Sequence, residues 1–200
     1  MRPRPGLPVV LAVALLAPAR ATDLVLGPVE LEHALTIGRA SDAERARFHD
    51  RYLAALGDPT AERLEVVTEF RRVVLAAENR IRQGDRMFSA RQANETNRPW
   101  RGKLTIALRL RFHPQNVLVR VPSYEVALGQ PPLRALDVRR TPLYALQGAT
   151  QQPGVATALI GGLVESDFDA VEIGQTKRAI RVLLDGTELA HTTIDFARLE

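Results

Sequence analysis

The basic residues between positions 101 and 122 are the side chains of this sequence best suited to hold a ligand. The segment RGKLTIALRLRFHPQNVLVRVP contains five Lys or Arg residues and no Asp or Glu. Guanidinium groups bind carboxylates and phosphates through charge-assisted hydrogen bonds. The candidate ligand-binding residues are Lys103, Arg109, Arg111 and Arg120. We therefore expect an anion-binding surface in this part of the chain.

A β-hairpin would gather these arginines on one face of a sheet. Apolar and polar residues alternate over 103–112, which is typical of a half-buried strand, and the apolar alternation resumes over 117–121. If the turn is centred on Pro114-Gln115, Arg109 lies directly opposite Arg120 while the apolar side chains share the other face. Facing like charges destabilise a sheet, and a bound anion relieves the repulsion. The alternative is that carboxylates from the flanking segments neutralise the arginines.

Glu165, Asp167 and Asp169 form the most acidic cluster in the sequence. Because they are spaced two residues apart, they share one face if the segment is a strand. Converging carboxylates could bind calcium or serve as the acid/base pair of a hydrolase, with His191 as a further candidate. An alternation of acidic and apolar residues is also typical of a strand in a sheet that is buried on one face only, where the acidic side chains point into solvent. We favour this interpretation. We therefore assign no catalytic residue.

The common catalytic and metal-binding motifs are absent from the sequence. The chain has no cysteine, which excludes disulfides and a thiolate nucleophile. No serine lies in a Gly-x-Ser-x-Gly motif or precedes a lysine by three residues, and the four histidines form no closely spaced pair. A single tryptophan, with no interleaving of aromatic and basic residues, argues against nucleic acid as a partner. We expect no metal and no cofactor.

Residues 1–21 have the form of a secretory signal peptide. Two arginines precede an apolar run at 7–17, and Ala19-Arg20-Ala21 is typical of a cleavage site. The run is too short to span a bilayer, so we expect no integral membrane segment after cleavage. Secreted eukaryotic domains of this size more often contain disulfides. The sequence therefore indicates a bacterial protein that is periplasmic or secreted.

The remaining charge is unevenly distributed. Removal of residues 1–21 would take three arginines and no acid, which lowers the formal net charge from +4 to +1. Residues 86–140 contain 11 basic and 3 acidic residues, whereas the segments on either side contain more acidic than basic residues. This distribution indicates an anionic partner, or else flanking segments that fold back on the basic part and neutralise it.

Residues 22–102 are predicted to be mainly helical, after an extended beginning. Positions 24–37 read as one or two short strands interrupted at Gly27-Pro28. Ser89 is placed to cap a short helical turn. Trp100 is expected to pack over the junction between the helices and the strands rather than to stack on a ligand.

Two longer helices are predicted within this part of the chain. A capping box at Ser41 starts the first, which is expected to run to about Leu56. Asp58-Pro59 starts the second, because aspartate is a good N-cap and proline is tolerated at the first helical position. Apolar residues then recur every three or four positions until Gly84, where this amphipathic helix is expected to end.

Residues 103–200 are predicted to form antiparallel strands. Besides the hairpin above, strands are expected at 124–128, 135–146, 155–172, 177–184 and 189–196. Asp185-Gly186 predicts a tight hairpin, and Gly161-Gly162 predicts a β-bulge. We therefore expect one α+β domain over 22–200, with an N-terminal segment of two helices packed on an antiparallel β-sandwich.

Binding is the function that this pattern favours. We expect an exported, non-catalytic binding or envelope-assembly module whose basic strand face recognises an anionic glycan, a lipid or a protein partner. The alternative is a hydrolase of an envelope polymer that uses a carboxylate acid/base pair. A third possibility is a subunit of a larger complex, which should expose an apolar patch beside its basic residues.

Overall fold

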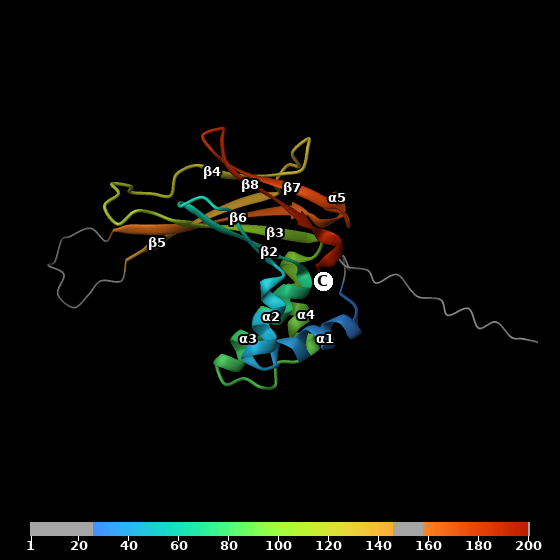
Figure 1. Cartoon of the computed structure of the whole chain (residues 1–200). Coiled ribbons are helices and arrows are strands. Elements are labelled where there is room, and N and C mark those ends of the chain that lie inside the picture. Colours follow the sequence, from blue (N-terminus) through green and yellow to red (C-terminus); the bar gives the residue numbers. More distant parts are fainter. Residues whose placement is uncertain (1–25, 146–157, 200) are drawn as a thin grey trace, which may run out of the picture.

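The computed structural model describes residues 26–145 and 158–199 (Figure 1). The predicted signal peptide at 1–21, the start of the first predicted strand at 24–25 and the beginning of the strand predicted at 155–172 lie outside these ranges. In the described part of the chain, no helix combines the length and the apolar character needed to cross a membrane. The α+β fold class is confirmed, since helices near the N-terminus pack on antiparallel sheets.

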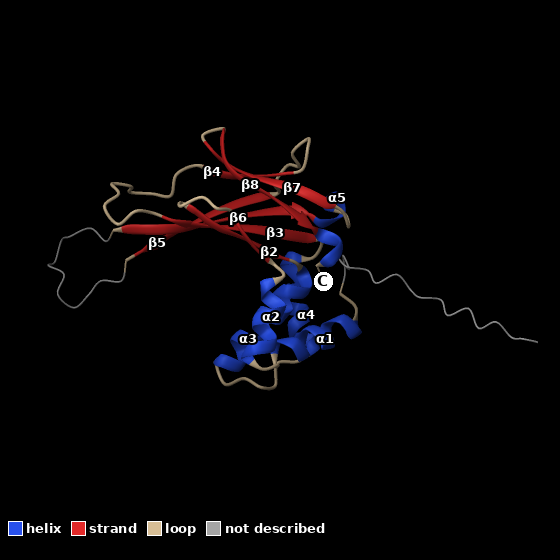
Figure 2. Ribbon diagram, viewed as in Figure 1, coloured by secondary structure: helices blue, strands red, loops and turns tan. Residues whose placement is uncertain are grey.

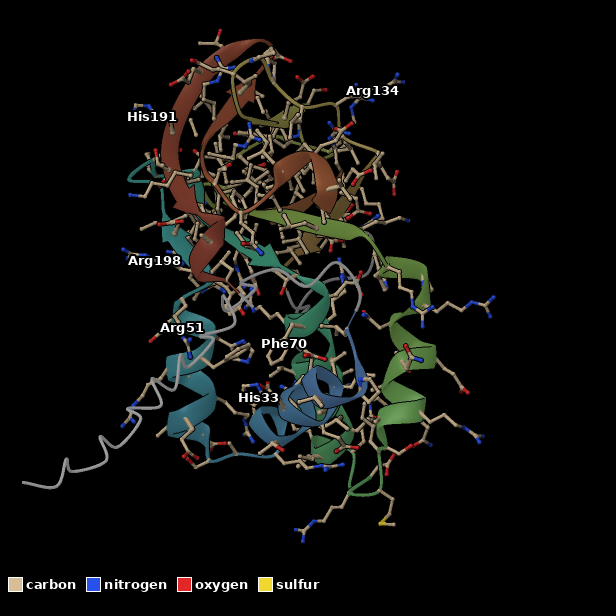
Figure 3. The ribbon with its side chains drawn as sticks, turned by 90° about the vertical axis from the view of Figure 1, so that its right-hand side faces the viewer. His33, Arg51, Phe70, Arg134, His191 and Arg198 are labelled. Atoms are coloured by element: carbon tan, nitrogen blue, oxygen red, sulfur yellow. The ribbon has the colours of Figure 1, made fainter. Side chains whose placement is uncertain are left out.

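The helices form a layer against one end of a sheet (Figure 2). They are α1 (Pro28–Gly38), α2 (Asp42–Asp50), α3 (Glu69–Arg82) and α4 (Ala90–Asn97), followed by the 3₁₀ turn η1 (Arg98–Trp100). The rings of His33 on α1 and Phe70 on α3 lie edge to face, with centroids 5.5 Å apart (Figure 3). A Cβ atom at Gly38 would lie 2.8 Å from the carbonyl oxygen of Val74, so only glycine permits this close approach of α1 to α3.

The strands form two antiparallel sheets. Sheet A has the order β1-β2-β3-β6-β5, and sheet B has the order β4-β7-β8. The strands are β1 (Leu53–Ala55), β2 (Ala61–Val67), β3 (Lys103–Arg111), β4 (Tyr124–Leu128), β5 (Asp137–Tyr144), β6 (Leu159–Asp169), β7 (Lys177–Leu184) and β8 (Thr187–Asp195). A short helix α5 (Ala170–Ile173) follows β6, and the 3₁₀ turn η2 (Phe196–Arg198) follows β8.

The core lies between the two sheets and continues into the helical layer. From sheet A, Leu104, Ile106 and Leu108 are almost completely buried. Ile180 and Val182 of β7 are fully buried on the side of sheet B. These residues and the buried apolar residues of α3 belong to one hydrophobic cluster. Sheet B covers one face of sheet A, and the helices cover one end of its opposite face (Figure 2).

The strand predicted at 24–37 was wrong, because positions 28–38 form α1. Gly27 is the N-cap and Pro28 is the first helical residue, where a missing N–H has no cost. The glycine-proline pair is therefore a helix start rather than the break between two strands. Leu31 and Leu35, four residues apart, supply the buried face.

The helix predicted from Asp58 was wrong in its first part, because 61–67 form β2. The Asp58 carboxylate accepts hydrogen bonds from the backbone N–H groups of Thr60 and Ala61, which is a turn leading into a strand. The true N-cap is Thr68, whose side chain accepts from the N–H of Arg71. The helix predicted from Ser41 is confirmed at its start but ends at Asp50, and the chain continues into β1.

The hairpin predicted between 103–112 and 117–121 was also wrong. The tight turn forms, with the N–H of Asn116 donating to the carbonyl oxygen of His113 at 3.0 Å. The chain then does not return along β3, because both edges of β3 are already paired, with β2 on one side and β6 on the other. Residues 112–123 form a loop instead.

The remaining predictions for the strands and turns are confirmed. The later strands lie within a few residues of the predicted ranges. Asp185 and Gly186 both have positive φ at the turn between β7 and β8, as a tight hairpin requires. The pairing of β5 with β6 shifts between Leu143 and Tyr144, next to Gly161, where the bulge was predicted. Ser89 caps α4 with a complete capping box.

Candidate functional site

The predicted site residues on β3 lie on the face of sheet A that points away from the sandwich core, called here the outer face. Leu104, Ile106 and Leu108 point into the core, so the alternate positions of β3 point outward. Helices cover this face near the start of β3 and leave its end open, where Arg109 and Arg111 are exposed (Figure 1). The outer face therefore has a covered end and an open end.

At the covered end, polar groups join α3 to sheet A. Arg72 donates to the hydroxyl of Thr105, which in turn donates to the carboxylate of Asp167. Arg139 on β5 donates to both oxygens of Asp167, at 2.7 and 3.1 Å. The guanidinium carbons of Arg72 and Arg139 lie 3.9 and 5.0 Å from the centroid of the Trp100 ring. These five residues are called the Asp167 network below.

The Asp167 network holds its carboxylate in the ionised form. Burial by itself would raise the pKa of Asp167, but hydrogen bonds from Arg139 and Thr105 and the positive charges of Arg139 and Arg72 outweigh it, so the pKa is lowered. The pKa of Arg139 is raised, chiefly by its hydrogen bond to Asp167. A general acid needs a raised pKa, so this environment suits a structural ion pair rather than acid catalysis.

At the open end, three arginines lie close together. Arg63 of β2 is directly opposite Arg109 in the ladder, and Arg111 lies two residues further along β3. A bulge in β2 between Ala61 and Arg63 inserts Glu62, whose carboxylate lies 3.5 Å from Nε of Arg109 and 2.8 Å from Nη2 of Arg111. Arg63, Arg109 and Arg111 are called the arginine cluster below.

The arginine cluster carries more positive charge than its own contacts neutralise. Glu62 is shared between Arg109 and Arg111, whose side chains are 49% and 69% exposed. Nε of Arg63 is buried and has no hydrogen-bond partner among the described residues. Because facing like charges destabilise a ladder, the cluster is an arrangement that an anion would stabilise.

Of the predicted ligand-binding residues, the structure brings together only Arg109 and Arg111. Lys103 lies at the covered end of β3, where its ammonium group is 5.9 Å from the centroid of the Trp100 ring. Arg120 lies in the loop 112–123 and not opposite Arg109, so that part of the prediction was wrong. Arg63 was missed because its segment read as a helix, although it alternates with Leu64 and Val66 in a way that also fits a strand.

The three acidic residues do not converge on an open site, because Glu165 and Asp167 both contact Arg139 and Asp169 lies apart from them. Glu165 and Asp167 share the outer face, but Asp167 is almost fully buried in its network, so the interpretation of an exposed face was wrong for this residue. The Asp169 carboxylate accepts from the N–H of Val171 and caps α5. His191 is on β8 of sheet B, far from the helical layer, and contacts Glu188 at 3.0 Å (Figure 3).

Two pockets in the described structure lie away from the arginine cluster, and the first of them borders Arg72 and Trp100 of the Asp167 network. One of about 180 Å³ lies between α3, α4 and Trp100, and one of about 390 Å³ lies between β1 and β8. Neither is lined by the acidic residues or the histidine considered above. Within residues 26–145 and 158–199, no group of three or more His, Asp or Glu side chains is placed to hold a metal ion.

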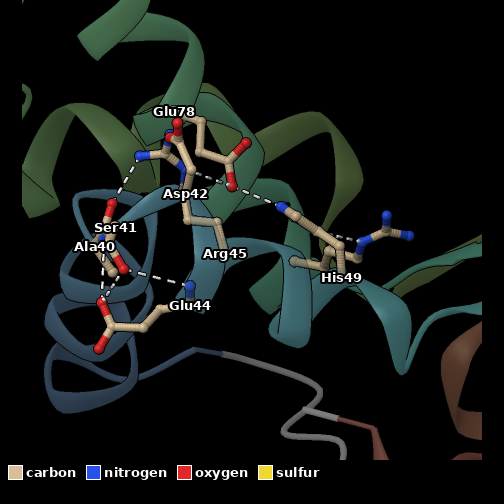
Figure 4. A network of polar contacts seen from close by, with 8 residues as sticks. Ala40, Ser41, Asp42, Glu44, Arg45, His49 and Glu78 are labelled. Carbon is tan, nitrogen blue, oxygen red and sulfur yellow. Dashed lines mark hydrogen bonds and ion pairs between the residues drawn. The ribbon is translucent and has the colours of Figure 1, made fainter.

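A second polar network joins α2 to α3 (Figure 4). Arg71 is buried and donates from Nε to Nδ1 of His49 at 3.2 Å, so Nε2 of the histidine carries the proton shared with Glu78 at 2.6 Å. Arg71 also contacts Glu65 at 2.5 Å. Since these groups bond to one another, their arrangement serves the packing of the helices.

Comparison of the chain with protein-family models, with curated proteins and with solved structures found no match.

Proposed function

We propose that the protein is an exported, non-catalytic binding module that holds an anionic ligand on the arginine cluster of sheet A. The observation that carries the proposal is the placement of Arg63 directly opposite Arg109, with Glu62 as the carboxylate shared by Arg109 and Arg111. Two excess positive charges at an exposed sheet surface attract phosphate, sulfate or carboxylate groups. Export is supported by the N-terminal sequence, which has the form of a signal peptide.

Binding accounts for the site better than hydrolysis does. A hydrolase that uses two carboxylates needs one with a raised pKa and both near a concave surface. The pKa of Asp167 is lowered, and its oxygens are occupied by Arg139 and Thr105. The arginine cluster, in contrast, lies on an open sheet surface where a polymer or a larger anionic partner has access.

Binding of inorganic polyphosphate at low and high salt tests this proposal. The double variant Arg63→Glu/Arg109→Glu should bind at least about tenfold more weakly than the natural chain, because two attractive charges become repulsive. The matched control is Arg82→Glu/Arg86→Glu, which changes the net charge equally at two exposed residues in the helical part of the chain. Equal affinity in the two variants would exclude the arginine cluster as the binding surface.

A further inference from the structure

The loop 112–123, which follows the open end of β3, exposes an unusual group of apolar side chains. Val117, Leu118 and Val119 are 93%, 36% and 87% exposed. Elsewhere in the described residues, exposed large hydrophobic side chains do not occur consecutively in the sequence. Exposed apolar groups that lie together indicate a surface that is covered by a partner. These three residues are called the apolar tip below.

The apolar tip is held in place by hydrogen bonds at the base of its loop. The N–H of Phe112 donates to the carbonyl oxygen of Ile160 at 2.9 Å, and the amide of Asn116 donates to the carbonyl oxygen of Leu159 at 2.8 Å. Asn116 also accepts from the N–H of Leu118 at 2.9 Å. The loop is thus fixed to the start of β6, where Ile160 is itself 41% exposed. These hydrogen bonds therefore hold the apolar tip in its exposed position.

Arginines lie on both sides of the apolar tip in the sequence. Arg111 comes directly before the loop, and Arg120 follows Val119 and is exposed. The sequence contains no Asp or Glu between Glu95 and Glu125. A short apolar group flanked by arginines matches the boundary of an anionic bilayer, where apolar side chains enter the acyl region and guanidinium groups remain at the phosphates.

We infer that the protein docks on the surface of an anionic lipid bilayer through this end of the sandwich, with the apolar tip inserted past the headgroups into the outer part of the acyl region. The inference rests on the proposed function, because Arg111 belongs to the arginine cluster and the lipid phosphates are its anion. A stable protein interface usually covers about 800 Å² on each partner and has an apolar centre with a polar rim. Three aliphatic residues on one narrow loop are too few for such a centre, but they suffice for shallow insertion that is assisted by charge.

Vesicle flotation of the natural chain is the test, with vesicles of phosphatidylcholine alone and of phosphatidylcholine mixed with phosphatidylglycerol. The natural chain should float with the anionic vesicles only, and less at high salt. The variant Val117→Ser/Val119→Ser should bind these vesicles at least about tenfold more weakly, because it removes two apolar side chains whose transfer from water into the bilayer favours binding. The matched control Val29→Ser/Val171→Ser changes two valines that are 77% and 66% exposed on α1 and α5, and it should bind like the natural chain.

Polyphosphate binding separates this inference from the proposed function. The Val117→Ser/Val119→Ser variant should bind polyphosphate as the natural chain does, since its arginines are intact. Binding of polyphosphate without binding of vesicles would overturn the lipid inference and leave the proposed function standing, whereas failure to bind either would overturn both. Vesicle binding that is unchanged in the valine variant would also overturn the inference. So would self-association of the natural chain that is lost in this variant, because it would make the tip a protein interface.

Discussion

The side chain with the largest expected contribution to stability in the site region is Asp167. It is buried and accepts two hydrogen bonds from Arg139, whereas Asp137, which contacts the same arginine at 2.7 Å, has a side chain that is 58% exposed. We expect Asp167→Asn to lower the free energy of unfolding by about 2 kcal/mol, because it leaves buried donors without their charged acceptor. Asp137→Asn, the control, should cost less than about 1 kcal/mol. Urea denaturation measures both, and equal losses would contradict this assignment.

The same carboxylate should make stability depend on pH. Because the pKa of Asp167 is lower in the folded chain than its ordinary value of 3.8, its contribution is present above that pH and is lost as the pH falls through the folded value. The natural chain should therefore lose stability below about pH 4 more steeply than Asp167→Asn does. Burial raises the pKa of Glu69, which acts in the opposite direction but equally in both proteins. If the free energy of unfolding falls equally with pH in the two proteins, Asp167 is not the cause of this pH dependence.

Glu62 provides a test of the arginine cluster in which affinity should increase. Its carboxylate contacts Arg109 and Arg111 and competes with any bound anion. We expect Glu62→Gln to strengthen polyphosphate binding about threefold, since the substitution removes a repulsive charge and keeps the shape of the side chain. Glu125→Gln, at an exposed position of β4 in the other sheet, should leave the affinity unchanged. Isothermal calorimetry of the two variants decides, and unchanged affinity in Glu62→Gln would count against the site.

At the scale of elements, the pairing of β3 with β6 depends on a glycine. A Cβ atom at Gly161 would overlap the backbone carbonyl oxygen of Leu110, whereas the close contacts of one at Gly162 would be with the side chain of Val121, and the nearest backbone atom would be at ordinary contact distance. Because a backbone atom in a sheet cannot rotate away, Gly161→Ala should cost about 2 kcal/mol, and Gly162→Ala should cost less. Thermal denaturation compares the two variants. A smaller loss for Gly161→Ala would contradict the close approach of these strands.

The elements that the sequence predicted well are those with a single periodicity and a local signal. β3 alternates without interruption, and the turn at Asp185-Gly186 needs only its own two residues to form. The segment around β2 was misread because Leu64 and Val67 of the strand continue to Phe70 of α3 at a spacing that imitates one helix. Only tertiary pairing with β3 distinguishes the two, and single-sequence periodicity does not contain that information.

At the scale of the whole molecule, the sequence indicated a basic surface but not its composition. Arg109 and Arg111 share a face because they lie two residues apart on one strand, which is a local property. Arg63 joins them from a strand about forty residues earlier, and Lys103 and Arg120 lie elsewhere, because strand order decides which residues meet. The predicted pairing of Arg109 with Arg120 was therefore wrong, and the arginine that does face Arg109 was not predicted from the sequence.

The charge distribution of the whole chain also acquires a structural meaning. Of the basic residues in the middle segment, Arg139 lies in the Asp167 network, where carboxylates neutralise it, and Arg109 and Arg111 lie at the open end of sheet A, where both contact Glu62. The flanking acidic segments thus neutralise one end of the outer face more fully than the other. We expect anions to bind at the open end and not beside Trp100.

The most direct test of this account is an NMR titration of the natural chain with inorganic polyphosphate, observed at the Nε–Hε groups of the arginines and at the indole of Trp100. The account predicts that the signals of Arg63, Arg109 and Arg111 shift together with one dissociation constant, while those of Arg139 and Trp100 stay in place. Shifts at Arg139 and Trp100 without shifts in the arginine cluster, or no shifts at all, would contradict it.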